Sequence, residues 1–189
     1  MRRSEVTNAE AQETKQRSLI RSTKRVFVKK NFGGFRYKPR GDWFSFAKGK
    51  RISFYKRAQI LVADFWGITE ARGEGHIPNL DYLTMFADYR VPQCLVYLGA
   101  LRYSDALVET LKNGEVLSSG DRREVEIRAC SIWCVERIRQ HLWKLVEERD
   151  GKSCHISSAL IDFYMWPYAK KHHNEMAHIP IHHTRCIYY

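Results

Sequence analysis

The sequence from His76 to Leu101 reads HIPNLDYLTMFADYRVPQCLVYLGAL, and in it the carboxylate of Asp88 lies between the largely apolar run 83–87 and the segment from Val91 to Leu101. Pro92 follows four residues later, where proline suits the first turn of a helix. A carboxylate at this place either accepts hydrogen bonds from the unpaired N–H groups at the start of that helix or takes part in chemistry. The two roles are compatible, so both stay open for Asp88.

The composition predicts a globular protein. A chain of 189 residues with 44% hydrophobic residues has room for one domain with a core and an appended arm. No apolar run approaches the roughly 20 residues that cross a bilayer, and no apolar segment follows the basic start. The five cysteines are scattered, which is typical of reduced thiols. We therefore expect a soluble, cytoplasmic protein that does not contact a membrane.

The positive charge is concentrated in the first quarter of the chain. The whole chain carries a net charge of +11, and Met1 to Arg51 hold 15 Lys and Arg against 4 Asp and Glu, which leaves the remainder balanced. We therefore expect residues 1–48 to form a basic arm and loop, with partial helix or disorder over residues 1–31 and a loop with anchoring aromatic rings after it. Such an arm binds nucleic acid through its charge, acts as a targeting signal, or has no specific role.

The rest of the chain follows helical periodicity, so we predict an all-α fold without strands. Besides the helix near Pro92, the predicted helices run from a cap at Ser53 to a stop at Gly73 and Gly75, over Ser104–Lys112, over Ser119–Arg149, and from about Ser157 to Lys171 with a kink at Pro167. In the longest helix the pattern is apolar on more than one face. We therefore expect Glu126 and Arg128 to be buried and paired there.

The histidines and cysteines near the C-terminus do not have the spacing of a zinc site. The sequence also lacks the glycine-rich loops of nucleotide-binding folds. We expect neither a metal nor a cofactor.

Two functions are compatible with these features. In the first, the protein is a hydrolase whose buried acid is Asp88, with Phe86 and Tyr89 stacking on a planar base and Lys56 or Arg90 meeting a phosphate. In the second, it is a helical RNA-binding or scaffold protein whose basic arm carries the affinity. The residues alone do not favour either strongly.

Four segments resemble one family. They are ISFYKRAQILVAD at residues 52–64, LTMFADYRVPQ at 83–93, EVEIR at 124–128 and RCIYY at 185–189. In this order they resemble the queuosine salvage family of queuosine 5'-phosphate N-glycosylase/hydrolases, over roughly Gly49 to Tyr189. The family is related to the helix-hairpin-helix DNA glycosylases, and residues 88–91 resemble the catalytic-Asp segment of those enzymes.

The resemblance implies hydrolysis of the bond between ribose and queuine in queuosine 5'-phosphate, which frees queuine for tRNA modification. Asp88 would stabilise the positive charge on the ribose. Met85 and Phe86 would line the base, Asp162 would accept hydrogen bonds from it, and Lys56 and Arg90 would meet the phosphate.

The resemblance also bears on the domain organisation. We expect a monomer whose residues 49–189 form the catalytic domain. Proteins of the family are longer at the N-terminus, so this domain is expected to be incomplete and the activity of this chain stays open. An inactive form is the alternative.

Overall fold

The computed structural model describes residues 44–45 and 51–187. The chain divides into two units, Met1–Arg40 and Gly41–Tyr189, and all described residues belong to the second. The predictions for the basic arm therefore lie almost entirely outside the described residues.

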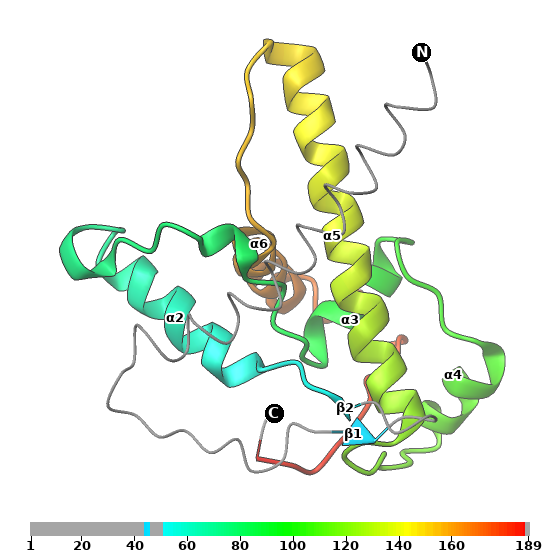
Figure 1. The fold of residues 1–189 in the computed structure, drawn as a ribbon. Helices are drawn as coiled ribbons and strands as arrows, with labels where there is room; N and C mark the ends of the chain where they lie inside the picture. Colours follow the sequence, from blue (N-terminus) through cyan, green and yellow to red (C-terminus); the bar gives the residue numbers. More distant parts are fainter. Residues whose placement is uncertain (1–43, 46–50, 188–189) are drawn as a thin grey trace, which may run out of the picture. The chain divides into compact units, whose positions relative to one another are not determined.

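The described part of the second unit is helical, as predicted (Figure 1). Its helices are α2 (Lys56–Ile68), α3 (Arg90–Tyr97), α4 (Asp105–Lys112), α5 (Arg122–Asp150) and α6 (Ser158–Lys171), with short 3-10 helices η1 (Gly73–Gly75) and η2 (Leu80–Tyr82). The prediction of no strands was wrong in one place. Strands β1 (Phe44–Ser45) and β2 (Arg51–Ile52) form a two-residue antiparallel pair.

Several predicted helix starts are confirmed. Pro92 lies in the first turn of α3, where its missing N–H costs no hydrogen bond. The hydroxyl of Ser104 accepts a hydrogen bond from the amide of Leu107 at the start of α4, and Ser157 does the same for Leu160 at the start of α6. Local side-chain chemistry fixes these three boundaries.

Other boundaries differ from the prediction. Helix α2 begins at Lys56 rather than at Ser53, because the backbone of Tyr55 is left-handed with φ of 48° and breaks the helical path there. It also ends at Ile68, before Gly73 and Gly75, where the sequence predicted its end. Helix α5 begins at Arg122, and its cap is Asp121, whose carboxylate accepts from the amide of Arg123 at 2.8 Å. The end of α6 at Lys171, by contrast, is as predicted, with Pro167 inside the helix, and a kink at Pro167 stays a prediction.

The buried ion pair of α5 joins different residues from those predicted. Arg128 pairs with Glu124 at 3.0 Å, and both side chains are 0% exposed. Glu126 instead pairs with Arg122 on the exposed side of the helix. Residues four apart share a helix face, whereas residues two apart do not, so Glu124 and Glu126 face different surroundings.

Helix α3 lies at the centre of the packing. It contacts both α5 and α6, and α5 contacts α6 (Figure 1). Val91, Cys94 and Leu95 of α3 are all 0% exposed and belong to the main hydrophobic cluster. The segment before α3 and the ends of the neighbouring helices are therefore brought together around its N-terminus. No described helix is both long and apolar enough to cross a membrane.

Replacing Leu95 with alanine should lower the free energy of unfolding by about 2–5 kcal/mol, because it leaves a cavity at the centre of the core. Urea unfolding followed by circular dichroism measures this change. Leu98→Ala is the matched control, since Leu98 is 52% exposed and its loss should cost about 0.5 kcal/mol or less. Equal losses in the two variants would contradict the central place of α3.

Candidate active site

The site is built on residues 84–88, a segment without regular secondary structure that we call the Asp88 segment and that is buried from Met85 onward. Buried backbone N–H and C=O groups need partners, and here side chains from three helices supply them. Gln59 of α2 accepts from the amide of Thr84 at 2.8 Å. Asp162 of α6 accepts from the amide of Phe86 at 2.8 Å. Arg128 of α5 donates from Nε to the carbonyl of Ala87 at 3.1 Å.

Asp88 accepts hydrogen bonds from the first amides of helix α3, which is one of the two roles that the sequence left open for it. Its Oδ1 accepts from the amides of Arg90 and Val91 at 3.0 and 2.9 Å, and the residue is only 7% exposed. Both of these hydrogen bonds reach the same oxygen. These two bonds therefore fix the carboxylate in direction through Oδ1.

Three ionisable groups influence one another at this point. Burial raises the pKa of Asp88, and the amide of Val91 and the charge of Lys56 oppose that rise. Burial also raises the pKa of Asp162, to about 7, with the amide of Phe86 opposing the rise and the charge of Asp88 adding to it. Burial lowers the pKa of Lys56, which the charge of Asp88 opposes. The structure thus brings Lys56, Asp88 and Asp162 together from α2, the Asp88 segment and α6.

The two apolar residues predicted to line a base lie beside the acid. Met85 is 0% exposed and belongs to the main hydrophobic cluster, whereas Phe86 is 5% exposed. The ring of Phe86 packs edge-on against Phe163 of α6, with 5.8 Å between the ring centroids. Since Phe163 is 37% exposed, this aromatic pair reaches from the site to the surface. That these rings contact a base stays a prediction.

Arg90 lies at the start of α3 next to Asp88, and its guanidinium is directed to other partners. Nη1 donates to Oε1 of Gln93 at 3.2 Å and lies 3.4 Å from Nδ1 of His173. The charge of Arg90 has only a minor effect on the pKa of Asp88, smaller than that of Lys56. Of the two cations predicted to meet a phosphate, Lys56 is therefore the one more closely associated with the carboxylates.

The sequence reasoning missed two amides that support this region. Gln59 holds Thr84, as described above, and also donates to the carbonyl of Phe54 at 2.8 Å. Gln93 of α3 donates from Nε2 to the carbonyls of Met176 and Ile179, at 3.1 and 2.7 Å. A polar residue within an otherwise apolar helical stretch is the signal that marks both positions in the sequence.

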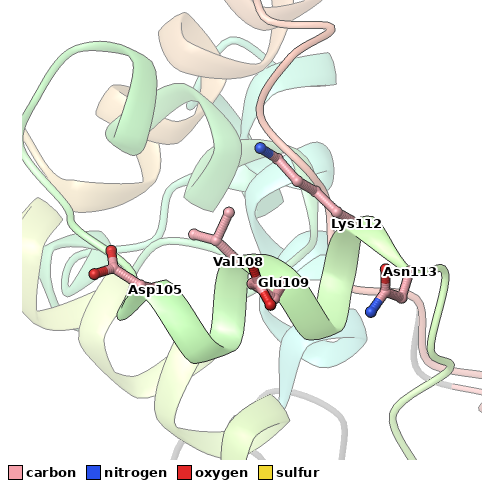
Figure 2. A pocket seen from close by; sticks show the side chains of 5 residues that line it. All are labelled: Asp105, Val108, Glu109, Lys112 and Asn113. Carbon is pink, nitrogen blue, oxygen red and sulfur yellow. The ribbon is translucent and has the colours of Figure 1, made fainter.

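A surface hollow of about 270 Å³ lies elsewhere, along helix α4 (Figure 2). It is lined by Asp105, Val108, Glu109, Lys112 and Asn113, and none of these was predicted to take part in the site. Within the described residues, no three side chains of His, Cys, Asp or Glu gather as ligands for a metal ion.

The raised pKa of Asp162 predicts a dependence of stability on pH. The folded chain holds the proton of Asp162 more tightly than the unfolded chain, so its contribution to the free energy of unfolding is complete below about pH 4 and is lost as the pH rises toward about 7. Asp162→Asn should flatten this fall in urea unfolding measured from pH 4 to 7. Asp64→Asn, on the exposed side of α2, controls for loss of a surface carboxylate. Equal slopes in wild type and Asp162→Asn would contradict the prediction.

Comparison of this sequence with known proteins finds matches to one protein family. A family model described as "Queuosine salvage protein" matches residues 11–189, and so begins upstream of Gly49, where we expected the likeness to start. A queuosine 5'-phosphate N-glycosylase/hydrolase of Mus musculus is 56% identical over 142 residues, which are 75% of this chain and 42% of the relative. Proteins with the same name from Bos taurus and Sphaerobacter thermophilus are 58% identical over 143 residues and 38% identical over 142 residues.

Each of those alignments covers 75% of this chain, but 42% of the Bos taurus protein and 41% of the Sphaerobacter thermophilus protein. The chain thus spans about two fifths of the length of these relatives. The match with the family model extends over most of the chain. The chain therefore belongs to the queuosine salvage protein family.

Proposed function

We propose that the Asp88 site hydrolyses the N-glycosidic bond of queuosine 5'-phosphate and releases queuine, which then serves tRNA modification. One observation carries the proposal: a buried carboxylate is fixed by two amides at the start of α3 through one oxygen only. The names of the relatives, queuosine 5'-phosphate N-glycosylase/hydrolases, supply the substrate.

The chemistry requires a fixed negative charge. As the bond between C1' of the ribose and the nitrogen of the base breaks, positive charge develops on the ribose, and a preorganised carboxylate stabilises it by about 3 kcal/mol. Asp88 takes this role and orients the attacking water. The water oxygen then bonds to C1', while the departing base keeps the bonding electron pair and gains a proton.

The neighbouring residues suit the two ends of the substrate. Met85 and Phe86 line the base, and the carboxyl of Asp162 accepts hydrogen bonds from its edge or from its amine. Lys56 and Arg90 meet the phosphate. A phosphate beside Lys56 would favour the charged form of that amine, against the burial that lowers its pKa.

We also infer that residues 49–189 form the catalytic domain and act as a cytoplasmic monomer. The relation of this domain to the helix-hairpin-helix DNA glycosylases is supported by residues 88–91, where an aspartate lies two residues before a short helix that leads to a glycine turn at Gly99, with φ of 73°.

A second candidate function is binding without turnover. Two observations favour it: the basic charge between Met1 and Arg51, and an apolar stripe on α2 in which Leu61, Phe65 and Ile68 are 59%, 41% and 83% exposed. In this reading the chain is a helical RNA-binding or scaffold protein, or an inactive form of the enzyme, and the basic arm contacts nucleic acid.

The purified chain should release queuine from queuosine 5'-phosphate, detected by chromatography, and Asp88→Asn should slow the release by about 100-fold or more. Loss of the negative charge removes the stabilisation of the ribose, while the asparagine oxygen can still accept from the amides. Asp81→Asn is the matched control, because Asp81 is an exposed carboxylate in η2 and its loss should leave the rate unchanged.

No release from a folded chain would contradict the proposed hydrolysis. RNA binding that persists unchanged in Asp88→Asn would then support the second candidate.

A further inference from the structure

The buried ion pair between Glu124 and Arg128 has a place in the fold that stability alone does not explain. Both side chains are 0% exposed, and they meet at 3.0 Å within one helix. Moving two charges out of water costs about as much as their attraction returns, so a buried pair is often no more stabilising than two apolar side chains. The contacts of the guanidinium indicate what else the pair does.

Arg128 is held in one orientation by its surroundings. Its Nη1 donates to Oε1 of Glu124, and its Cζ lies 4.4 Å from the centre of the Phe54 ring. On the other side, Oε2 of Glu124 accepts from the amide of Gly120 at 3.3 Å, so the carboxylate is fixed as well. A planar guanidinium that meets both a carboxylate and an aromatic ring has little freedom to turn.

In this orientation, Nε of Arg128 donates to the carbonyl of Ala87 at 3.1 Å. That carbonyl belongs to the peptide group that joins Ala87 to Asp88. The amide of Phe86, two residues before Asp88, donates to Oδ2 of Asp162. The backbone that leads into Asp88 is therefore fixed by one cation from α5 and one carboxyl from α6.

We infer that Arg128 is a positioning residue for Asp88: by holding the Ala87 carbonyl, it sets the direction of the Asp88 carboxylate, and Glu124 in turn orients Arg128. The part of this inference that concerns catalysis rests on the proposed function of Asp88. The geometric part concerns only how the Asp88 segment is held, so it is testable without turnover.

Helix α5 itself offers a matched control. Arg122 and Glu126 form an ion pair with the same spacing of four residues, at 2.7 Å, but their side chains are 81% and 50% exposed. The same substitutions in this exposed pair change the same chemical groups without touching the Asp88 segment.

The first test compares steady-state kinetics of queuine release for Arg128→Lys and Glu124→Gln with those of Arg122→Lys and Glu126→Gln. Lysine keeps the charge but lacks the planar guanidinium of arginine, so it cannot donate to Glu124 and to the Ala87 carbonyl in the same geometry. We expect kcat to fall by about 100-fold with little change in KM, because a misdirected carboxylate weakens the transition state more than substrate binding. The control variants should keep the wild-type kcat. Unchanged kcat in Arg128→Lys would overturn the inference.

The second test measures amide hydrogen exchange by NMR in the full chain. In Arg128→Lys, protection of the Arg90 and Val91 amides, which Asp88 caps, should fall while protection in α6 stays the same. Val135→Ala is the comparison for general destabilisation, since Val135 is 0% exposed in α5. A loss of protection that is uniform in both variants, or absent at Arg90 and Val91, would show a merely structural pair and overturn the inference.

If a single variant does not fold, the double variant Glu124→Gln with Arg128→Met removes both charges together and leaves no unpaired one. It should show the same local loss of protection at Arg90 and Val91, and retained protection there would again overturn the inference. If the wild-type chain releases no queuine, the proposed function fails, and the exchange measurement alone decides the role of Arg128.

Discussion

The structure depends on one constraint: a buried stretch of backbone that belongs to neither helix nor strand must still satisfy its N–H and C=O groups. The Asp88 segment meets this constraint with side chains from α2, α5 and α6. Gln59, Arg128 and Asp162 are therefore not isolated polar residues in an apolar interior. Each lies where a helix passes the same short segment, and together they explain why polar and charged groups are buried around it.

Asp88 shows how one side chain serves both fold and chemistry. The two amides at the start of α3 offset part of the cost of burying its charge, and they also fix its orientation. A carboxylate held in this way needs no rearrangement when positive charge appears beside it. Burial still raises its pKa, so the cap and the nearby Lys56 are what keep the ionised form accessible.

Sequence reasoning recovered the features that short-range chemistry determines. The caps at Ser104 and Ser157, Pro92 in the first turn of α3 and the capping role of Asp88 each depend on residues within a few positions. The predicted pairing of Arg128 with Glu126 was wrong, although the spacing of four residues between Glu124 and Arg128 already favours Glu124. Elsewhere sequence reasoning failed where distant packing decides. The bond between Asp162 and Phe86 joins residues 76 positions apart, and no local pattern predicts it.

The amide of Gln93 sets a limit on how this protein can diverge. The side chain of Gln93 on α3 donates to the carbonyls of both Met176 and Ile179. These two bonds fix the position of the connection that follows α6 relative to α3. Because the bonds reach backbone groups, they are indifferent to which side chains occupy this connection. An inserted or deleted residue would shift both carbonyls out of register. Over evolution, this connection should rarely accept new lengths, and its buried side chains at Met176 and Ile179 should stay apolar.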